Sequence, residues 1–109
     1  MGEALYDTSA LIEAYRQGKA PKGCTTILNL VEFPKAMDFN LKVLYPSKSD
    51  YNLALEISLE LLKIGKPLPA VDVIIAAVAL NNNLSLVTKD RHFDSIRDVR
   101  RDFKLIVEG

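Results

Sequence analysis

The chain has 109 residues, of which 49% are hydrophobic and 26% are charged. This length fits one domain, which we expect to span residues 1–109, and the composition is that of a soluble globular protein, not of a disordered chain. The formal net charge is zero, so the chain lacks the overall positive charge that would indicate a nucleic-acid binder. No apolar run approaches the roughly 18 residues of a membrane span, and a single cysteine, Cys24, excludes an internal disulfide, so we expect a cytoplasmic protein.

The first part of the chain predicts alternating strands and helices. Residues 5–6 read as a short strand, and a helix capped by Thr8 or Ser9 follows it and ends near Gly18. A loop rich in Gly, Pro and Lys then leads to a second short strand at residues 24–26, where we expect Cys24 to be a small buried hydrophobic residue.

A second helix is expected around Glu32. Pro34 has no backbone N–H and clashes with a preceding carbonyl, so either it lies in the first turn of this helix or the helix bends there. In both cases we expect Glu32 near the helix start and close to the strand ends.

A longer helix is expected to begin at Ser47 or Ser49 and to end at Ile64, before Gly65. Nearly all its positions are apolar, apart from one narrow polar stripe made of Asn52, Glu56, Glu60 and Lys63. A helix with so little polar surface must be covered by more than one sheet. We expect a homodimer or protein-partner contact there, and packing within one domain is the alternative.

The rest of the chain continues the alternation. A helix near Asp72 ends at the asparagines of residues 81–83, a strand covers residues 84–87, and a short helical segment precedes a last strand at residues 103–107. Long helical connections between strands imply right-handed crossovers and a mostly parallel sheet. The expected fold class is therefore α/β, with helices on both faces.

Four carboxylates stand where strands give way to helices or just inside a helix: Asp7, Glu32, Asp72 and Asp90. In an open α/β sheet the carboxyl ends of the strands line one crevice, so these acids can converge. Converging carboxylates repel one another and need a cation, protonation or basic partners. Mg²⁺ and Mn²⁺ are hard ions that prefer such oxygen ligands.

Each acid also has a purely structural explanation. Asp7 can cap a helix, Glu32 can lie at the surface, and Asp72 is favourable at a helix start whatever else it does. Asp90 can be a turn residue, and the single histidine, His92, is expected to be packed or solvent-facing, with an approach to the scissile phosphate as its alternative. The basic residues near both ends of the chain form either a rim for a nucleic-acid substrate or a solvated surface.

Four ordered motifs resemble those of the PIN-domain family, and most closely those of VapC-type toxins: residues 7–12, Glu32, residues 72–79 and residues 86–93. The resemblance implies a three-layer α/β/α fold with a mostly parallel central sheet. It also implies a metal-dependent ribonuclease in which an acidic pocket binds Mg²⁺ or Mn²⁺.

The same resemblance assigns roles to individual residues. Asp7, Glu32, Asp72 and Asp90 would be catalytic, with Asp7, Asp72 and Asp90 as the main metal ligands. In addition, Ser9 and Thr88 would hold metal-bound water. Asp94 follows the last motif and is not part of the resemblance; we expect it to pair with Arg97 on the surface, with a place in the metal shell as the alternative.

The function implied by the resemblance is hydrolysis of phosphodiester bonds in RNA by the toxin of a VapBC-type toxin–antitoxin pair. Such toxins usually form homodimers and are silenced by an antitoxin whose tail covers the pocket. Two alternatives stay open, namely an RNA-processing PIN nuclease outside a toxin–antitoxin system and a non-catalytic scaffold that binds RNA or protein.

Overall fold

The computed structural model describes residues 3–109, in which strands and helices alternate over most of the chain. The elements, in chain order, are β1 (Ala4–Tyr6), α1 (Thr8–Arg16), β2 (Cys24–Thr26), α2 (Ile27–Glu32), the 3₁₀ helix η1 (Pro34–Asp38), β3 (Lys42–Leu44), α3 (Lys48–Lys63), α4 (Ala70–Asn81), β4 (Ser85–Thr88), the 3₁₀ helix η2 (Arg91–Phe93), α5 (Asp94–Val99) and β5 (Lys104–Val107).

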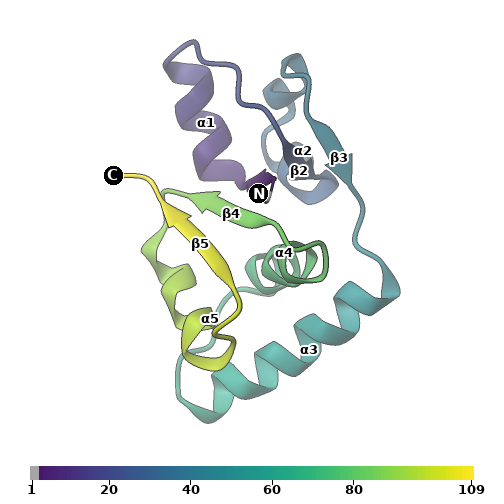
Figure 1. Cartoon of the computed structure of the whole chain (residues 1–109), viewed down its shortest axis with the longest axis vertical. Coiled ribbons are helices and arrows are strands. Elements are labelled where there is room, and N and C mark those ends of the chain that lie inside the picture. The colour runs from purple at the N-terminus through teal and green to yellow at the C-terminus, as the bar shows by residue number, and fades with distance from the viewer. Residues whose placement is uncertain (1–2) are drawn as a thin grey trace.

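The five strands form one parallel sheet in the order β3-β2-β1-β4-β5 (Figure 1). Helix α1 lies on one side of this sheet, while α3 and α4 lie on the other, so the predicted three-layer α/β/α fold is confirmed. The chain leaves β1 toward β2 in one direction and returns through β4 in the other. The gap between β1 and β4 is therefore the topological switch point, where open α/β sheets place their ligands.

In the described part of the chain, none of the helices combines the length and apolar character needed to cross a bilayer.

The face of the sheet opposite α1 carries a continuous row of buried side chains. The register pairs Cys24 with Leu5, Leu5 with Leu86, and Leu86 with Leu105. Residues paired across neighbouring strands point to the same face, so the row forms one apolar strip. All four side chains belong to the main core, and Cys24 is buried there as expected.

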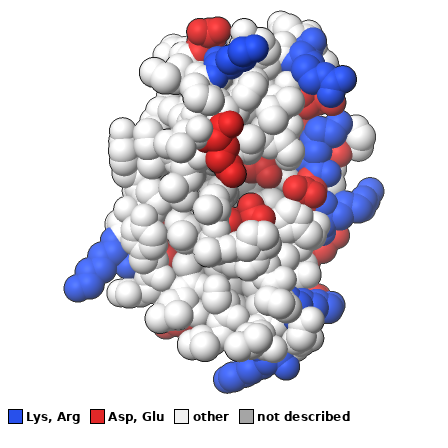
Figure 2. Space-filling model, turned by 180° about the vertical axis from the view of Figure 1, so that it is seen from behind, with Lys and Arg blue, Asp and Glu red and all other residues white. Residues whose placement is uncertain are grey.

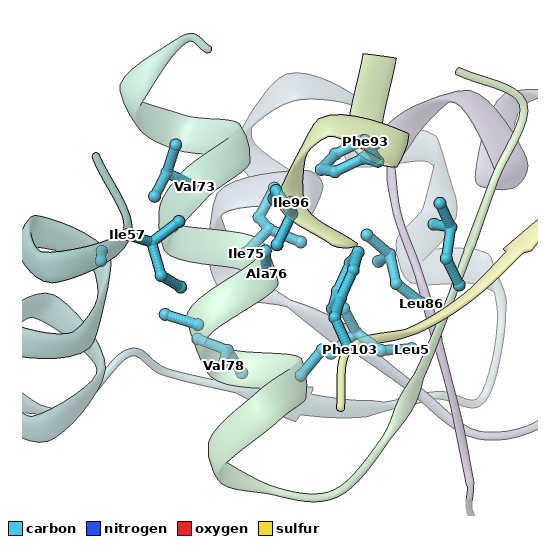
Figure 3. Packing of buried hydrophobic residues seen from close by; sticks show 14 of the residues in the cluster. Leu5, Ile57, Val73, Ile75, Ala76, Val78, Leu86, Phe93, Ile96 and Phe103 are labelled. Carbon is cyan, nitrogen blue, oxygen red and sulfur yellow. The ribbon is translucent and has the colours of Figure 1, made fainter. Parts of the chain in front are cut away.

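Helix α4 lies between this strip and helix α3. Its side chains are buried over most of its circumference, from Val73 to Ala79, which is the pattern of a helix enclosed on both sides. Figure 3 shows Ile57 of α3 facing Val73 and Val78 of α4, with the sheet residues beyond them. Packing within the domain therefore accounts for the inner face of α3.

The ends of α3 agree with the sequence prediction. Ser47 caps the helix, because its hydroxyl accepts from the N–H of Asp50 while the Asp50 carboxylate accepts from the N–H of Ser47. The last helical residue is Lys63, Ile64 is the C-cap, and Gly65 follows with a φ of +72°.

The outer face of α3 keeps an exposed apolar stripe, which we call the α3 stripe. Its residues and exposed fractions are Tyr51 49%, Leu55 63%, Leu59 52% and Leu62 64%.

Two features of the first half differ from the sequence prediction. Strand β3 was not expected, although it pairs in parallel with β2 along its whole length. Helix α2 is only six residues long, because Thr26 caps it at one end and Pro34 opens η1 just after the other. Glu32 is thus the last residue of α2, and the expectation that it lies near a helix start is wrong.

Gly23 fixes the entry into β2. Its φ is +137°, and a Cβ at this position would lie 2.5 Å from the carbonyl oxygen of Ala4 in β1. Its own carbonyl accepts the N–H of Lys42 at 3.0 Å, so the residue lies between β1 and β3. Only glycine satisfies both the backbone conformation and the close approach.

The layered core can be tested with two leucines on the same helix. Leu61 is fully buried and Leu55 is 63% exposed. Leu61→Ala should lower the free energy of unfolding by about 2–5 kcal/mol, because it leaves a cavity between α3 and α4. Leu55→Ala should change it by no more than about 0.5 kcal/mol. Denaturant unfolding at a protein concentration that keeps the chain monomeric measures both, and equal losses would contradict the described packing.

Candidate active site

All four predicted acids line one pocket at the carboxyl ends of β1 and β4. It has a volume of about 240 Å³, and its walls are formed by Asp7, Thr8, Ser9, Ile12, Asn29, Glu32, Asp72, Ile75 and Asp90. Asp7 follows β1 and Asp90 follows β4, so these two flank the switch point, while Asp72 comes from the first turn of α4. In Figure 2 several acidic side chains gather around a hollow near the middle of the molecular face, with lysines and arginines mainly toward its margins.

A larger hollow of about 420 Å³ lies along α1. Its charged walls combine Lys19 and Lys89 with Glu13 and Glu108, and Lys89 is already paired with Glu13 at 2.9 Å. The larger hollow therefore offers no group of converging acids. We assign the candidate site to the smaller pocket, because its chemistry is the more specific of the two.

Asp7 is the most completely hydrogen-bonded acid of the pocket. Its Oδ1 accepts from the hydroxyl of Ser9 at 2.8 Å and from the N–H of Ala10 at 3.0 Å, and its Oδ2 accepts from the hydroxyl of Thr88 at 2.6 Å. The contact with Ala10 makes Asp7 the N-cap of α1. The prediction that Thr8 or Ser9 caps this helix is therefore wrong, although the structural alternative for Asp7 is correct.

The pKa of Asp7 is raised above that of an ordinary aspartate. Burial is the largest cause, and the negative charge of Asp90 raises the pKa further, while the hydrogen bonds from Thr88, Ala10 and Ser9 act in the opposite direction. The side chain is only 6% exposed. The fold thus holds a carboxylate where its ionised form is disfavoured, which is the environment that a cation would relieve.

Ser9 and Thr88 form the floor under Asp7. Each hydroxyl donates to Asp7 and accepts a backbone N–H from the loop after β4, from Lys89 to Ser9 at 2.9 Å and from Asp90 to Thr88 at 3.0 Å. A hydroxyl has one proton to donate, so neither keeps a donor for a water molecule, although each keeps a lone pair. In this structure the two residues position Asp7 and the Asp90 loop, and their role toward metal-bound water stays a prediction.

Glu32 reaches the rim of the pocket from the end of α2. Its Oε1 accepts the hydroxyl proton of Thr8 at 2.6 Å, and Thr8 in turn accepts from the side-chain amide of Asn29 at 3.0 Å. Asn29 is fully buried and also bonds Thr26. Glu32 is exposed but held in place, and the supporting Asn29 was missed by the sequence analysis.

His92 joins the other two acids. Its Nε2 lies 2.9 Å from Oδ2 of Asp72, and its Nδ1 lies 3.1 Å from Oδ1 of Asp90. Burial lowers the pKa of His92, but the hydrogen bonds to Asp72 and Asp90 and their charges outweigh this effect, so that the pKa is raised. The expectation of a merely packed or solvent-facing histidine needs correction, because both ring nitrogens engage acids of the pocket.

Asp94 is not among the residues that line the pocket; it is exposed at the start of α5. Its expected surface partner Arg97 donates to the carbonyl of Leu105 at 2.7 Å. Arg100 is likewise engaged, with Glu56 and Glu60 of α3. Two of the basic residues near the C-terminal end, Arg97 and Arg100, therefore make contacts within the domain.

The donor set of the pocket suits a hard divalent cation, because all four acids offer oxygen ligands. Within residues 3–109, however, no three acidic, histidine or cysteine side chains stand close enough together to hold a metal ion as they are placed. Mg²⁺ usually keeps several waters and binds through one or two carboxylates plus substrate phosphates. The pocket fits this sparse mode of binding better than a closed protein cage.

Comparisons with solved structures agree with the fold. A chain in the crystal structure of DNA-bound VapBC from Salmonella typhimurium is 19% identical, with 98% of each chain covered and a TM-score of 0.76. For VapBC-5 from Mycobacterium tuberculosis the identity is 20%, the coverage 97% of this chain and 99% of the other, and the TM-score 0.76. For VapBC2 from Rickettsia felis, bound to a promoter DNA fragment, the values are 17%, 95%, 97% and 0.75.

Comparison with curated protein sequences gives no match. The family model of the PIN domain, in contrast, matches residues 11–99, a range that contains Glu32, Asp72 and Asp90 and begins just after Asp7. This match covers most of the chain. The chain therefore belongs to the PIN-domain family.

Proposed function

We propose that this protein is a Mg²⁺- or Mn²⁺-dependent endoribonuclease that hydrolyses phosphodiester bonds in RNA. The observation that carries the proposal is the gathering of Asp7, Glu32, Asp72 and Asp90 around one pocket at the switch point of a PIN fold. Carboxylates so placed repel one another unless a cation or proton is present. A phosphate diester is itself anionic and could not approach the pocket without a cation.

In this proposal Asp7, Asp72 and Asp90 hold the ion, and Glu32 supports it from the rim. A bound Mg²⁺ or Mn²⁺ would neutralise the charge of the phosphate and polarise the water that attacks it. The chain itself contributes orientation, since Ser9 and Thr88 fix both oxygens of Asp7. Because substrate and nucleophile are held in one small pocket, part of the barrier is removed by positioning alone.

We further propose that the enzyme is the toxin of a toxin–antitoxin pair and acts on RNA in the cytoplasm. This is supported by the structural likeness to chains of VapBC complexes, which covers nearly the whole length of this chain and of each matched chain. A small antitoxin gene beside the gene for this chain would favour a toxin, whereas its absence would favour an RNA-processing nuclease. In a toxin, the partner protein would cover the acidic pocket.

The α3 stripe supports a homodimer. Four large apolar side chains on one helix face are more than isolated exposed hydrophobic residues, and such patches mark association surfaces. Helix α3 lies at the outside of the domain, where a second copy can reach it (Figure 1). A two-fold axis near the stripe would pair the same residues from both copies.

Replacing Asp7 by Asn tests the enzymatic proposal. The change keeps the shape of the side chain and a good N-cap for α1, but removes the charge that would bind the cation. Cleavage of a random-sequence RNA pool in Mn²⁺ should fall by about 100-fold or more. The exposed, distant Asp102→Asn is the matched control for loss of one carboxylate. Equal cleavage by wild type and Asp7→Asn would refute the proposal, as would cleavage that persists in excess EDTA.

The same substitution separates a functional Asp7 from a purely structural one. Because the folded-state pKa of Asp7 is raised, the folded wild type binds more protons than the unfolded chain above the unfolded-state pKa of about 3.9. The stability of the metal-free wild type should therefore fall, relative to Asp7→Asn, as the pH rises from about 4 through the raised pKa. Denaturant unfolding in EDTA at several pH values measures the difference. A difference that moves the other way would show that the ionised carboxylate stabilises the fold.

The homodimer is tested by Leu59→Glu in the α3 stripe. A carboxylate buried without a partner in an apolar interface costs several kcal/mol, so the dimer dissociation constant should rise by about tenfold or more. Gln17→Glu adds the same charge at the exposed C-cap of α1, on the other side of the sheet from α3, and should leave the constant unchanged. Analytical ultracentrifugation of both variants gives the comparison. A monomeric wild type at micromolar concentration would rule out the dimer.

A further inference from the structure

His92 occupies the space between two of the proposed metal ligands, which reach it from different elements. Asp72 comes from the first turn of α4, and Asp90 comes from the loop after β4. The imidazole bridges them with one nitrogen each, at 2.9 Å to Asp72 and 3.1 Å to Asp90. One rigid ring therefore lies between these two carboxylates and contacts both.

The orientation of the ring is itself fixed from below. His92 stacks on the ring of Phe93, with centroids 4.7 Å apart and an angle of 24° between the planes. Phe93 is fully buried in the main core, next to Ile96 of α5 (Figure 3). The histidine ring thus rests on a part of the molecule that cannot shift without disturbing the core.

Each carboxylate uses one oxygen on the ring and keeps the other. Among the described residues, no hydrogen bond engages Oδ1 of Asp72 or Oδ2 of Asp90, while Oδ2 of Asp72 and Oδ1 of Asp90 face His92. A carboxylate held through one oxygen can present the second to a cation in a defined direction. Groups that hold metal ligands in this way commonly contribute about 10- to 100-fold to metal affinity.

We propose that His92 is a positioning residue that fixes the separation and direction of the Asp72 and Asp90 carboxylates for a divalent cation. The inference rests on the proposed metal-dependent function and adds to it a residue that none of the family motifs assigned to the metal. It gives His92 no contact with the substrate. Its action passes through the two acids.

The test is Mn²⁺ binding by the full chain, measured by calorimetry at one pH. His92→Phe keeps a flat ring that can stack on Phe93 but has no nitrogen, so its Mn²⁺ affinity should be about 10- to 100-fold lower than that of the wild type. His92→Gln can retain the contact with Asp72, and His92→Asn the contact with Asp90. Both should bind Mn²⁺ with intermediate affinity, a graded rescue that a merely space-filling role would not produce.

Thermal unfolding of each variant controls for loss of the fold, and Asp102→Asn controls for a change of charge outside the pocket. If His92→Phe does not fold, the comparison of His92→Gln and His92→Asn with the wild type decides, because each lacks one contact only. Equal affinity in all folded variants would overturn the inference. So would tighter binding by His92→Phe, which would show that His92 opposes the ion.

The same measurement distinguishes this inference from the proposed function. A wild type that takes up no Mn²⁺ would refute both. A wild type that binds Mn²⁺ and cleaves RNA, together with variants of unchanged affinity, would leave the nuclease proposal intact and remove only the role of His92.

Discussion

Carboxylates that share a small pocket repel one another, and this protein offsets the repulsion with donors placed around each of them. Asp7 has two hydroxyls and one backbone N–H, and Glu32 has the hydroxyl of Thr8. Asp72 and Asp90 share one imidazole, which donates to one of them when neutral and to both when protonated. Several of these donors lie in α1, which Asp7 itself caps, so acid and donors hold one another in place. Helix α4 adds Asp72 to this group from its first turn, so the helix that fills the core also supplies one acid of the pocket.

Positions set by a short stretch of chain were predictable from the sequence. Asp7 and Asp90 follow apolar strands, and the strand ends of a parallel sheet meet at one edge, so their approach follows from strand–helix alternation alone. Strand β3 escaped prediction because its three residues, Lys42 to Leu44, have no alternating pattern long enough to recognise. The N-cap of α1 was predicted at Thr8 or Ser9, with Asp7 as a structural alternative, because all three are good capping residues and only geometry selects among them.

Positions set by packing between distant elements were not predictable. The bridge from His92 to Asp72 depends on where α4 lies beside η2, and a sequence pattern carries no information about that distance. Asn29 escaped notice for a similar reason, since its buried contacts reach back to Thr8 and Thr26. Family resemblance pointed to the acids because their letters recur in motifs. It also pointed to Ser9 and Thr88, whereas the contacts that Asn29 and His92 make became visible only in the folded chain.

Gly23 and Ala4 are in close contact at the N-terminal ends of β2 and β1, and this contact bears on the rim of the pocket. A side chain at Gly23 would push β2 away from β1, and Thr26, at the far end of β2, is the residue that starts the helix carrying Glu32. Strand β2 has only three residues, so its two ends lie close together. A substitution at Gly23, a partly buried residue outside the pocket, can therefore disturb the position of Glu32 without touching any acid of the pocket.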